Sequence, residues 1–390
     1  MNGTMEQNVL KLEFSGHIDS SNAPAAEAEA LAQIEAQPHE GLILDCQDLT
    51  YISSAGLRVV LHLRKLEPEL KLVNVSSEVY EILSMTGFTE MMPVEKAYRT
   101  LSIEGCEAIG RGANGTVYRI DRDTVVKVYH SADCLPDVQR ERELARKALV
   151  LGIPTAIPYD VVRVGESYGS VFELLNSRSF SKLIAADPDG MDTYVDLYVD
   201  LMQKMHSTRV KPGDMPEMKG VALGWVEFLR DYLPPEQAEK LVALVEAVPE
   251  RDTMLHGDYH TNNIVMQNDE VLIIDMDTLC VGHPIFELAS MYLGFVAFGE
   301  VDPNVTVSFL KLPHETAVRF WKKALAKYLG TQDPEAVRAV EEKAMVIGYA
   351  RLMRRTIRRD GFHTEEGRAN IELCRTRLAD LLPRVDSLTF

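Results

Sequence analysis

Apolar and polar positions along the first hundred residues alternate in the way expected of a small α/β domain. The expected strands cover residues 9–14, 41–46 and 70–75, and the expected helices cover residues 24–37, 53–66 and 77–85. Ser53 or Ser54 is expected to cap the second helix, because serine hydroxyls accept hydrogen bonds from free amides at helix starts. The pattern predicts strand and helix in strict alternation, three times over.

From about residue 102 the pattern changes to a meander of strands. Residues 107–120 and 124–129 are expected to form two strands joined by an Asp-Arg-Asp turn at 121–123. Helices and short strands are expected to about residue 173, and mostly helices beyond residue 194. One strand pair, 264–266 with 271–274, interrupts that helical part. The second part of the chain therefore begins strand-rich and ends mainly helical.

The strand pair is flanked by polar residues suited to phosphate chemistry. Residues 256–263 read His-Gly-Asp-Tyr-His-Thr-Asn-Asn, and residues 273–277 read Ile-Ile-Asp-Met-Asp. An antiparallel hairpin between them would place Asn263 and Asp275 together at its open end. Their hard oxygen atoms suit Mg²⁺ held jointly with nucleotide phosphates. Asp258, on the loop that enters the hairpin, is the candidate catalytic residue that orients an attacking hydroxyl and accepts its proton.

This HxDxxxxN and IDxD arrangement resembles the catalytic and metal-binding loops of aminoglycoside phosphotransferases and their relatives, among them choline and homoserine kinases. Protein kinases share the layout but usually carry Arg where Gly257 stands. The resemblance implies that Asp258 is catalytic and that Asn263 and Asp275 bind metal, with Asp277 a weaker candidate. It also implies a bilobal α+β fold with a small lobe of about residues 102–175 and a mainly helical large lobe of about residues 176–390.

A glycine pattern upstream fits the same interpretation. Gly110, Gly112 and Gly115 form GxGxxG, which lets a backbone approach phosphates closely. A strand pattern follows, as in the glycine loop of kinases, whereas a dinucleotide-binding fold would continue into a helix. Lys127, in the next strand, resembles the lysine that holds the α- and β-phosphates.

The expected ion-pair partner of Lys127 is a glutamate on the following helix. Glu141 is the better match by its distance to residues 152–154, and Glu143 is the alternative. Glu173 lies in a segment that resembles the hinge between lobes, where backbone groups would meet the adenine. Glu287 stands where many relatives carry Asp, and we expect it to support the catalytic loop.

A run of arginines near the C-terminus has helical spacing. Its members are Arg351, Arg354, Arg355, Arg358 and Arg359. Such a run usually forms a solvated helix face with local salt bridges. The alternative is a docking surface for an anionic substrate or for the first domain.

Residues 48–57, Asp-Leu-Thr-Tyr-Ile-Ser-Ser-Ala-Gly-Leu, follow a buried strand and open a helix. A phosphate added there would meet the positive end of the helix. The segment resembles the STAS domains of anti-sigma factor antagonists, a likeness that covers about residues 5–100. In that family a serine at this turn is phosphorylated, and it falls on Ser54. Those domains usually have Asp just before that serine, where this chain has Ser53.

Composition restricts the partners. The 390 residues carry a formal net charge of −18, and the first hundred hold 7 basic and 15 acidic residues, so most of the surface would repel a nucleic-acid backbone. We find no apolar run of membrane-spanning length and no signal segment, and therefore expect a cytoplasmic protein. The five cysteines are far apart and are expected to be reduced packing residues.

The combined expectation is an α/β STAS-like domain (1–100) followed by a kinase-like phosphotransferase domain (101–390). It would use ATP and Mg²⁺ to phosphorylate the hydroxyl of a small molecule. A protein hydroxyl, including that of Ser54, is the alternative acceptor. The competing class is a signalling module whose kinase-like part binds nucleotide and only controls what the STAS domain docks to, such as an anti-sigma-type protein.

Overall fold

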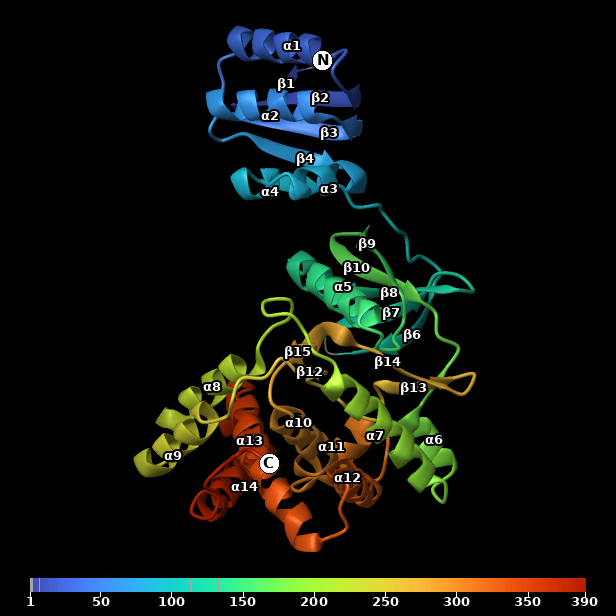
Figure 1. Ribbon diagram of the computed structural model, residues 1–390, viewed down its shortest axis with the longest axis vertical. Coiled ribbons are helices and arrows are strands. Elements are labelled where there is room, and N and C mark those ends of the chain that lie inside the picture. Colours follow the sequence, from blue (N-terminus) through green and yellow to red (C-terminus); the bar gives the residue numbers. More distant parts are fainter. Residues whose placement is uncertain (1–2, 7, 113, 132) are drawn as a thin grey trace. The chain divides into compact units, whose positions relative to one another are not determined.

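The computed structural model describes residues 3–6, 8–112, 114–131 and 133–390, and the chain forms two compact units (Figure 1). The first unit comprises Met1–Ser102 with Val161–Glu166, and the second comprises Ile103–Asp160 with Ser167–Phe390. Each unit has its own hydrophobic core.

The first unit is built on a five-stranded sheet in the order β1-β2-β3-β4-β5. Its strands are β1 (Gly3–Glu6), β2 (Val9–Ile18), β3 (Gly41–Ile52), β4 (Lys71–Val75) and β5 (Val94–Lys96). β1 is antiparallel to β2, and the other neighbours are parallel. The helices are α1 (Ala23–Ala36), α2 (Ser54–Leu66), α3 (Ser77–Met85) and α4 (Phe88–Met91). This confirms the alternating order predicted for the strands and helices between residues 9 and 85.

Alternation in β2 explains why this sheet forms where the sequence predicts it. Leu10, Leu12 and Phe14 are fully buried, while the residues between them are half-buried or exposed. The edge strands β1 and β5 were not predicted. They have four and three residues, too few for an alternating pattern to be recognised, and pairing with their neighbours defines them.

A second sheet has the order β6-β7-β8-β10-β9, and it belongs to the second unit except for the part of β9 within Val161–Glu166. Its strands are β6 (Glu107–Arg111), β7 (Gly115–Arg119), β8 (Thr124–Tyr129), β9 (Pro158–Val164) and β10 (Ser167–Glu173). The single strand predicted over residues 107–120 is wrong, because the glycine-rich segment divides it into β6 and β7. The turn at 121–123 is as predicted: the Asp121 carboxylate accepts the amides of Asp123 and Thr124, both at 2.8 Å. Helix α5 (Leu135–Val150) contacts β10.

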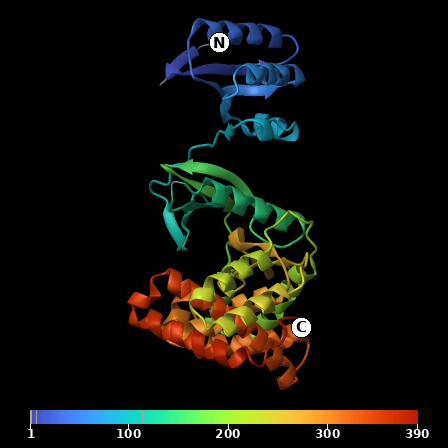
Figure 2. The same ribbon diagram turned by 90° about the vertical axis from the view of Figure 1, so that its left-hand side faces the viewer.

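The remainder of the second unit is mainly helical, as predicted. Its helices are α6 (Phe180–Ala186), α7 (Met191–Ser207), α8 (Met218–Phe228), α9 (Pro235–Glu246), α10 (Ile285–Phe295), α11 (Pro303–Leu310), α12 (His314–Leu329), α13 (Pro334–Arg358) and α14 (Glu365–Leu381). Short strands are β11 (Arg178–Ser179), β12 (Met254–Leu255), β13 (Ile264–Gln267), β14 (Glu270–Ile273) and β15 (Cys280–Val281), and 3-10 turns are η1 (Leu229–Asp231), η2 (Met276–Thr278), η3 (Ala297–Gly299) and η4 (Gly361–His363). Helix α13 packs against α8, α10 and α14 (Figure 2).

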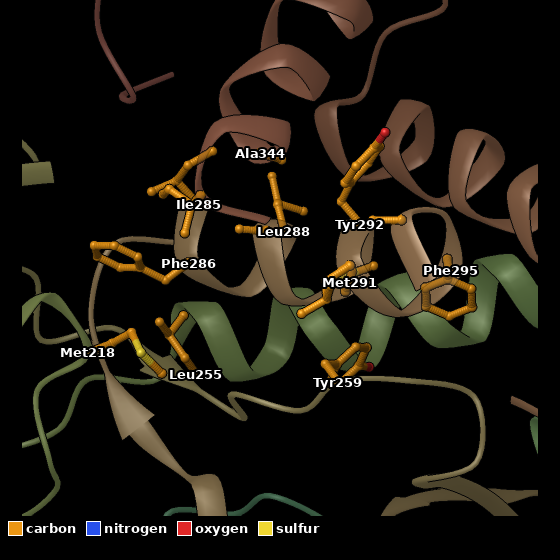
Figure 3. Close-up of a cluster of buried hydrophobic side chains, with 14 of the residues drawn as sticks. Met218, Leu255, Tyr259, Ile285, Phe286, Leu288, Met291, Tyr292, Phe295 and Ala344 are labelled. Carbon is orange, nitrogen blue, oxygen red and sulfur yellow. The ribbon is translucent and has the colours of Figure 1, made fainter. Parts of the chain in front are cut away.

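Helix α10 forms the centre of this core. Every residue from Ile285 to Phe295 except Ser290 is buried. Ile285, Leu288 and Tyr292 lie on the side of α13, while Leu255 and Tyr259 lie on the opposite side of α10 (Figure 3). Helix α10 therefore packs against the segment that contains residue 258. Within the described part of the chain, no helix combines the length and the apolar character that crossing a membrane requires.

Candidate active site

Hairpin β13–β14 forms as the sequence predicts. The strands pair antiparallel and turn at Asn268 and Asp269, whose left-handed backbones (φ 50° and 63°) match a tight two-residue hairpin turn. At the open end the Ile274 amide donates to the carbonyl oxygen of Asn263 at 2.9 Å. Asp275 follows directly, so the two candidate metal ligands lie at the same end of the hairpin.

Asp275 is held in a left-handed backbone conformation (φ 66°, ψ 67°) that is costly for a residue other than glycine. Its Oδ1 atom is 2.5 Å from Lys127 Nζ, and Asp277 Oδ2 is 3.8 Å from the same atom. Asn114, from the glycine-rich segment, donates to Asp277 Oδ2 at 2.9 Å. These contacts connect the strand-rich and helical parts of the unit across the site.

Lys127 also forms an ion pair with Glu141 Oε1 at 2.8 Å, and Tyr129 donates its hydroxyl to the other Glu141 oxygen. Glu143, the alternative partner, instead pairs with Arg146. Burial disfavours the charged form of Lys127, but the charges of Glu141 and Asp275 outweigh burial and raise its pKa above the usual lysine value. The ammonium group therefore stays protonated at neutral pH.

Asp258 lies on a loop whose shape depends on Gly257. Gly257 has φ +80°, and a Cβ atom there would lie 2.6 Å from the carbonyl oxygen of Thr278. The side chain of Asp258 is half-buried, and its Oδ2 atom is 3.4 Å from His260 Nε2. Burial would raise the pKa of Asp258, but the hydrogen bond and charge of His260, with the charges of His256 and Arg351, outweigh burial and lower it to about 2.

Glu287 holds the loop backbone, as the sequence indicated. It is 1% exposed, and its two oxygens accept the amides of His256 at 2.6 Å and Gly257 at 3.0 Å. Thr278 and Ser290 donate to the carbonyl oxygens of the same two residues, at 2.8 and 2.9 Å. The backbone entering Asp258 is therefore fixed by four bonds to side chains.

A pair of buried tyrosines, which sequence reasoning missed, anchors the other side of the loop. Tyr198 on α7 donates its hydroxyl to the Tyr259 carbonyl at 2.9 Å, and Tyr259 returns a bond to the Tyr198 carbonyl at 2.7 Å. The ring centroids are 4.6 Å apart. Because Tyr259 follows Asp258 directly, these bonds restrict where the candidate catalytic side chain can lie. No local pattern marks a pair separated by sixty residues.

The three glycines of the glycine-rich segment differ in what they permit. A Cβ atom on Gly115 would lie 2.5 Å from the Val128 carbonyl oxygen, so internal packing requires glycine there. Gly110 and Gly112 meet nothing closer than 3.7 Å and have no positive φ. Neither the fold nor the backbone explains glycine at these two positions. Ala113, between them and Gly115, lies outside the described residues.

Glu173 ends β10 at the connection to the helical part. Its amide donates to the Ile157 carbonyl at 3.0 Å, and its carboxylate accepts the Ile157 amide at 3.3 Å. The next residue, Leu174, donates its amide to the Asp123 carbonyl at 2.8 Å. The side chain of Glu173 is thus used within the protein, and the adenine contact remains a prediction.

Ser53, not Ser54, caps α2 in the first unit. The Ser53 hydroxyl accepts the Ala55 amide at 3.2 Å, whereas Ser54 is the first residue of the helix and is exposed. Helix starts carry free amides and a partial positive charge. A phosphate on Ser54 would therefore be accommodated without disturbing the cap.

The arginine run on α13 differs from the solvated face with local salt bridges that was expected. Arg351, Arg354 and Arg355 are half-buried, and each guanidinium lies over an aromatic ring. Among the residues that the structure describes, none of the five arginines forms an ion pair. The sequence expectation was wrong because one helix's spacing does not reveal the aromatic side chains of its neighbours.

The oxygen atoms of Asn263 and Asp275 fit a nucleotide–Mg²⁺ complex. Asn263 donates its amide nitrogen to the Asp258 carbonyl at 3.1 Å, and no contact within the described residues uses its amide oxygen. The Asp275 carboxylate is 42% exposed. No cluster of three or more His, Cys, Asp or Glu side chains able to hold a metal occurs in the described ranges. Residues 263 and 275 would thus supply two oxygens, and phosphates and water the rest.

Two protein families match the sequence. The sequence model of the phosphotransferase enzyme family, APH, matches residues 105–322, and that of the STAS domain matches residues 4–102. The N-terminal part is also 41% identical over 85 residues to the putative anti-sigma factor antagonist BtrV of Bordetella bronchiseptica. That alignment covers 21% of this chain and 72% of the relative.

Solved structures with a similar fold include aminoglycoside phosphotransferase APH(4)-Ia, with a TM-score of 0.50 and 11% identity over 72% of this chain and 96% of that one. A choline/ethanolamine kinase family protein from Mesorhizobium loti matches with a TM-score of 0.46 and 14% identity, over 71% of this chain and 87% of that one. At such identities the first likeness shows the fold alone. It agrees with the predicted kinase-like architecture of the second unit.

Proposed function

The chain belongs to the phosphotransferase enzyme family and carries an N-terminal STAS domain, and we propose that it transfers the γ-phosphoryl group of ATP to a hydroxyl group of a small molecule. One observation carries the proposal: Lys127, Asp275 and Asp258 belong to three separate segments, yet Lys127 bonds directly to Asp275. Asp258 lies at the entrance to the hairpin that Asp275 follows. The division into domains 1–100 and 101–390 is part of this proposal.

Asp258 would orient the acceptor hydroxyl. With its pKa near 2, it is ionised at neutral pH and able to accept a hydrogen bond, but it is a weak base. That suits phosphoryl transfer, whose loose transition state asks for positioning more than for early proton removal. We therefore propose that Asp258 acts mainly by placing the oxygen in line and receives the proton late.

Lys127 and the glycine loop would hold the nucleotide. Lys127 is kept charged by Glu141, so it can pair with phosphate oxygens without losing its position. Glycine at 110 and 112, which the fold does not require, would let backbone amides approach the phosphates. The hinge near Glu173 would receive the adenine.

Asn263 and Asp275 are the residues that would hold Mg²⁺, and when bound the ion would neutralise charge on the nucleotide phosphates. Asp275 pairs with Lys127 at 2.5 Å. Binding ATP would therefore exchange this internal ion pair for contacts of Lys127 with phosphate oxygens and of Asp275 with the metal.

A second candidate function follows from the first unit. The likeness to a putative anti-sigma factor antagonist suggests a signalling protein as a partner of the STAS domain. The exposed Ser54 at the start of α2 would be the residue whose phosphorylation controls that partner, with the second unit as its kinase.

The destination of the label from γ-labelled ATP distinguishes the two candidate functions. The intact chain is incubated with Mg²⁺ and a deproteinised small-molecule extract of bacterial cells, alongside Asp258→Ala and Ser54→Ala. The proposal expects labelled small molecules that disappear only with Asp258→Ala. Label on the protein that disappears with Ser54→Ala would favour the signalling function. ATP binding without any transfer would leave only a nucleotide-dependent docking role.

A further inference from the structure

The last two turns of α13 carry an unusual group of cations. Arg351, Arg354, Arg355, Arg358 and Arg359, here called the arginine face, gather at the C-terminal end of a helix in a chain of net charge −18. The described part of the chain supplies none of them with a carboxylate partner. In contrast, Arg338 near the start of the same helix pairs with Glu342 at 3.1 Å.

Aromatic rings hold the three half-buried arginines. The Arg351 guanidinium carbon lies 4.9 Å from the Trp225 ring centre, on α8. Arg354 lies over Phe228 of the same helix, at 5.8 Å, and Arg355 lies 4.6 Å from Phe298 of η3. Such stacking orders a guanidinium without neutralising it, and the edge of the group stays available for hydrogen bonds.

One end of the arginine face reaches the catalytic loop directly. Arg351 Nη1 donates to Ser290 Oγ at 2.8 Å, and Ser290 in turn donates to the carbonyl oxygen of Gly257 at 2.9 Å. The same Nη1 atom lies 3.5 Å from that carbonyl oxygen. Gly257 directly precedes Asp258, so the first arginine of the face is one residue from the candidate catalytic carboxylate.

A second series of contacts leads from Arg355 to Asp258. The Phe298 ring under Arg355 packs edge-on against Phe309 of α11, at 5.3 Å between centroids. Phe309 packs against His260 at 4.7 Å, and His260 Nε2 is 3.4 Å from the Asp258 carboxylate. Three aromatic side chains thus connect Arg355 with Asp258, and the charge of the Asp258 carboxylate acts on the Arg355 guanidinium.

Leaving these cations unpaired has a cost. Burial lowers the pKa of Arg355 to about 10 and also lowers that of Arg351, although both stay charged at neutral pH. Arg354 Nε is buried and has no hydrogen-bond partner among the described residues. Unpaired buried donors are unfavourable unless a ligand satisfies them. An anion on the arginine face would remove this cost.

We propose that the acceptor is a small anionic alcohol whose carboxylate or phosphate ester binds Arg354 and Arg355 while its hydroxyl lies at Asp258. The inference rests on the proposed phosphotransferase function and names its substrate class. The acceptor oxygen bonds to the γ-phosphorus as the bond to the β–γ bridging oxygen breaks; ADP leaves, and the hydroxyl proton passes to Asp258 and then to solvent. Polycations such as aminoglycosides would be repelled here.

Separation of a deproteinised small-molecule extract by charge tests the proposal. Anion exchange at pH 7 divides the extract into retained anions and unretained neutral or cationic compounds, and each fraction is offered to the intact chain with γ-labelled ATP and Mg²⁺. We expect Asp258-dependent labelling in the anionic fraction. Phosphatase treatment of that fraction beforehand would abolish its acceptor activity for a phosphate ester and preserve it for a carboxylate.

Variants then test whether the arginines are responsible. Arg354→Gln and Arg355→Gln should each raise the KM for the anionic acceptor about tenfold or more, since a charged hydrogen bond is lost, with the KM for ATP unchanged. Arg354→Lys should recover part of the loss. Arg375→Gln, which changes a half-buried arginine of α14, is the matched control and should have no effect. Melting temperatures of all variants check that they fold.

Acceptor activity in the unretained fraction would overturn the anionic assignment while leaving the phosphotransferase function intact. So would a rise in the KM for ATP, instead of the acceptor, in Arg354→Gln, because it would assign the arginine face to the nucleotide. Failure of the proposed function has a different signature: no Asp258-dependent label in either fraction.

Discussion

At the scale of single residues, the site is organised around charges that neighbouring side chains hold in place. Lys127 is fixed between Glu141 and Asp275, and Asp258 is kept ionised by the positive groups around it. Preorganised charge of this kind is worth more than charge that must be moved into position during a reaction.

The low pKa of Asp258 gives a pH dependence with a definite sign. Its folded-state pKa of about 2 lies below the ordinary 3.8, so this group stabilises the fold above pH 4. That contribution is lost as pH falls from about 4 to 2. We therefore expect kcat/KM to show no acid limb from Asp258 between pH 8 and pH 4. An acid limb near pH 5 that disappears in Asp258→Asn would contradict the assignment.

Glu141 and Glu143 provide a matched pair on one helix. Glu141→Gln should raise the KM for ATP about tenfold, because Lys127 loses a charged hydrogen bond. Its remaining carboxylate partners are then Asp275 and Asp277. Glu143→Gln removes surface pairs with Arg146 and Lys147 and should change KM by less than about twofold. Steady-state kinetics with varied ATP concentration measure the KM of both variants. Equal effects would mean that the buried ion pair does not position Lys127.

At the scale of elements, the catalytic loop depends on backbone shape and on the helices beneath it. Glu287 and Ser290 on α10 bond to the loop backbone, and Tyr198 on α7 holds Tyr259. Helices α7 and α10 thus hold the backbone on the two sides of Asp258. A change in loop shape should cost activity and stability together.

Gly257→Ala tests the loop shape against Gly330→Ala as control. Both glycines have positive φ, but a Cβ atom at Gly330 meets nothing within 4 Å, whereas one at Gly257 would lie 2.6 Å from a carbonyl oxygen. The control should cost about 1–2 kcal/mol in unfolding free energy and leave activity unchanged. Gly257→Ala should cost more and lower kcat. Chemical denaturation measures the unfolding free energy of each variant, and initial rates measure its activity. Similar effects of the two substitutions would be inconsistent with this account.

The sequence predicted the elements whose pattern is local. Hairpin β13–β14 was predicted because apolar strands and a turn lie within ten residues of each other. The apolar pattern alone indicated one strand over residues 107–120, whereas the GxGxxG motif predicted a glycine loop between strands, and β6 and β7 lie on its two sides. The bond between Asn114 and Asp277 joins residues 163 positions apart, and no single segment contains that information. The aromatic partners of the arginine face were missed for the same reason.

At the scale of the whole molecule, the residues that the structure describes form two hydrophobic cores. One core lies within residues 10–92 and the other within residues 144–388, and they share no residue. The family matches divide the sequence at nearly the same place. Two separate cores predict that a change in one unit can be studied without unfolding the other.

Leu44→Ala tests this separation. Leu44 is fully buried in the first core, and its truncation should cost about 2–5 kcal/mol there. Differential scanning calorimetry should show two unfolding transitions. The substitution should lower the midpoint temperature of only one of them. Addition of ATP and Mg²⁺ should raise the midpoint temperature of the other transition, because a ligand stabilises the unit that binds it. A single transition that shifts in both experiments would mean that the units unfold together.

The central claim is that Asp258 serves phosphoryl transfer rather than nucleotide binding, and one comparison tests it most directly. Label transfer from γ-labelled ATP to the accepted small molecule is measured for the intact chain and for Asp258→Asn, with ATP affinity determined by calorimetry for both. The account predicts a fall in kcat of about 10²–10⁴-fold with unchanged affinity. Undiminished transfer by Asp258→Asn would contradict it.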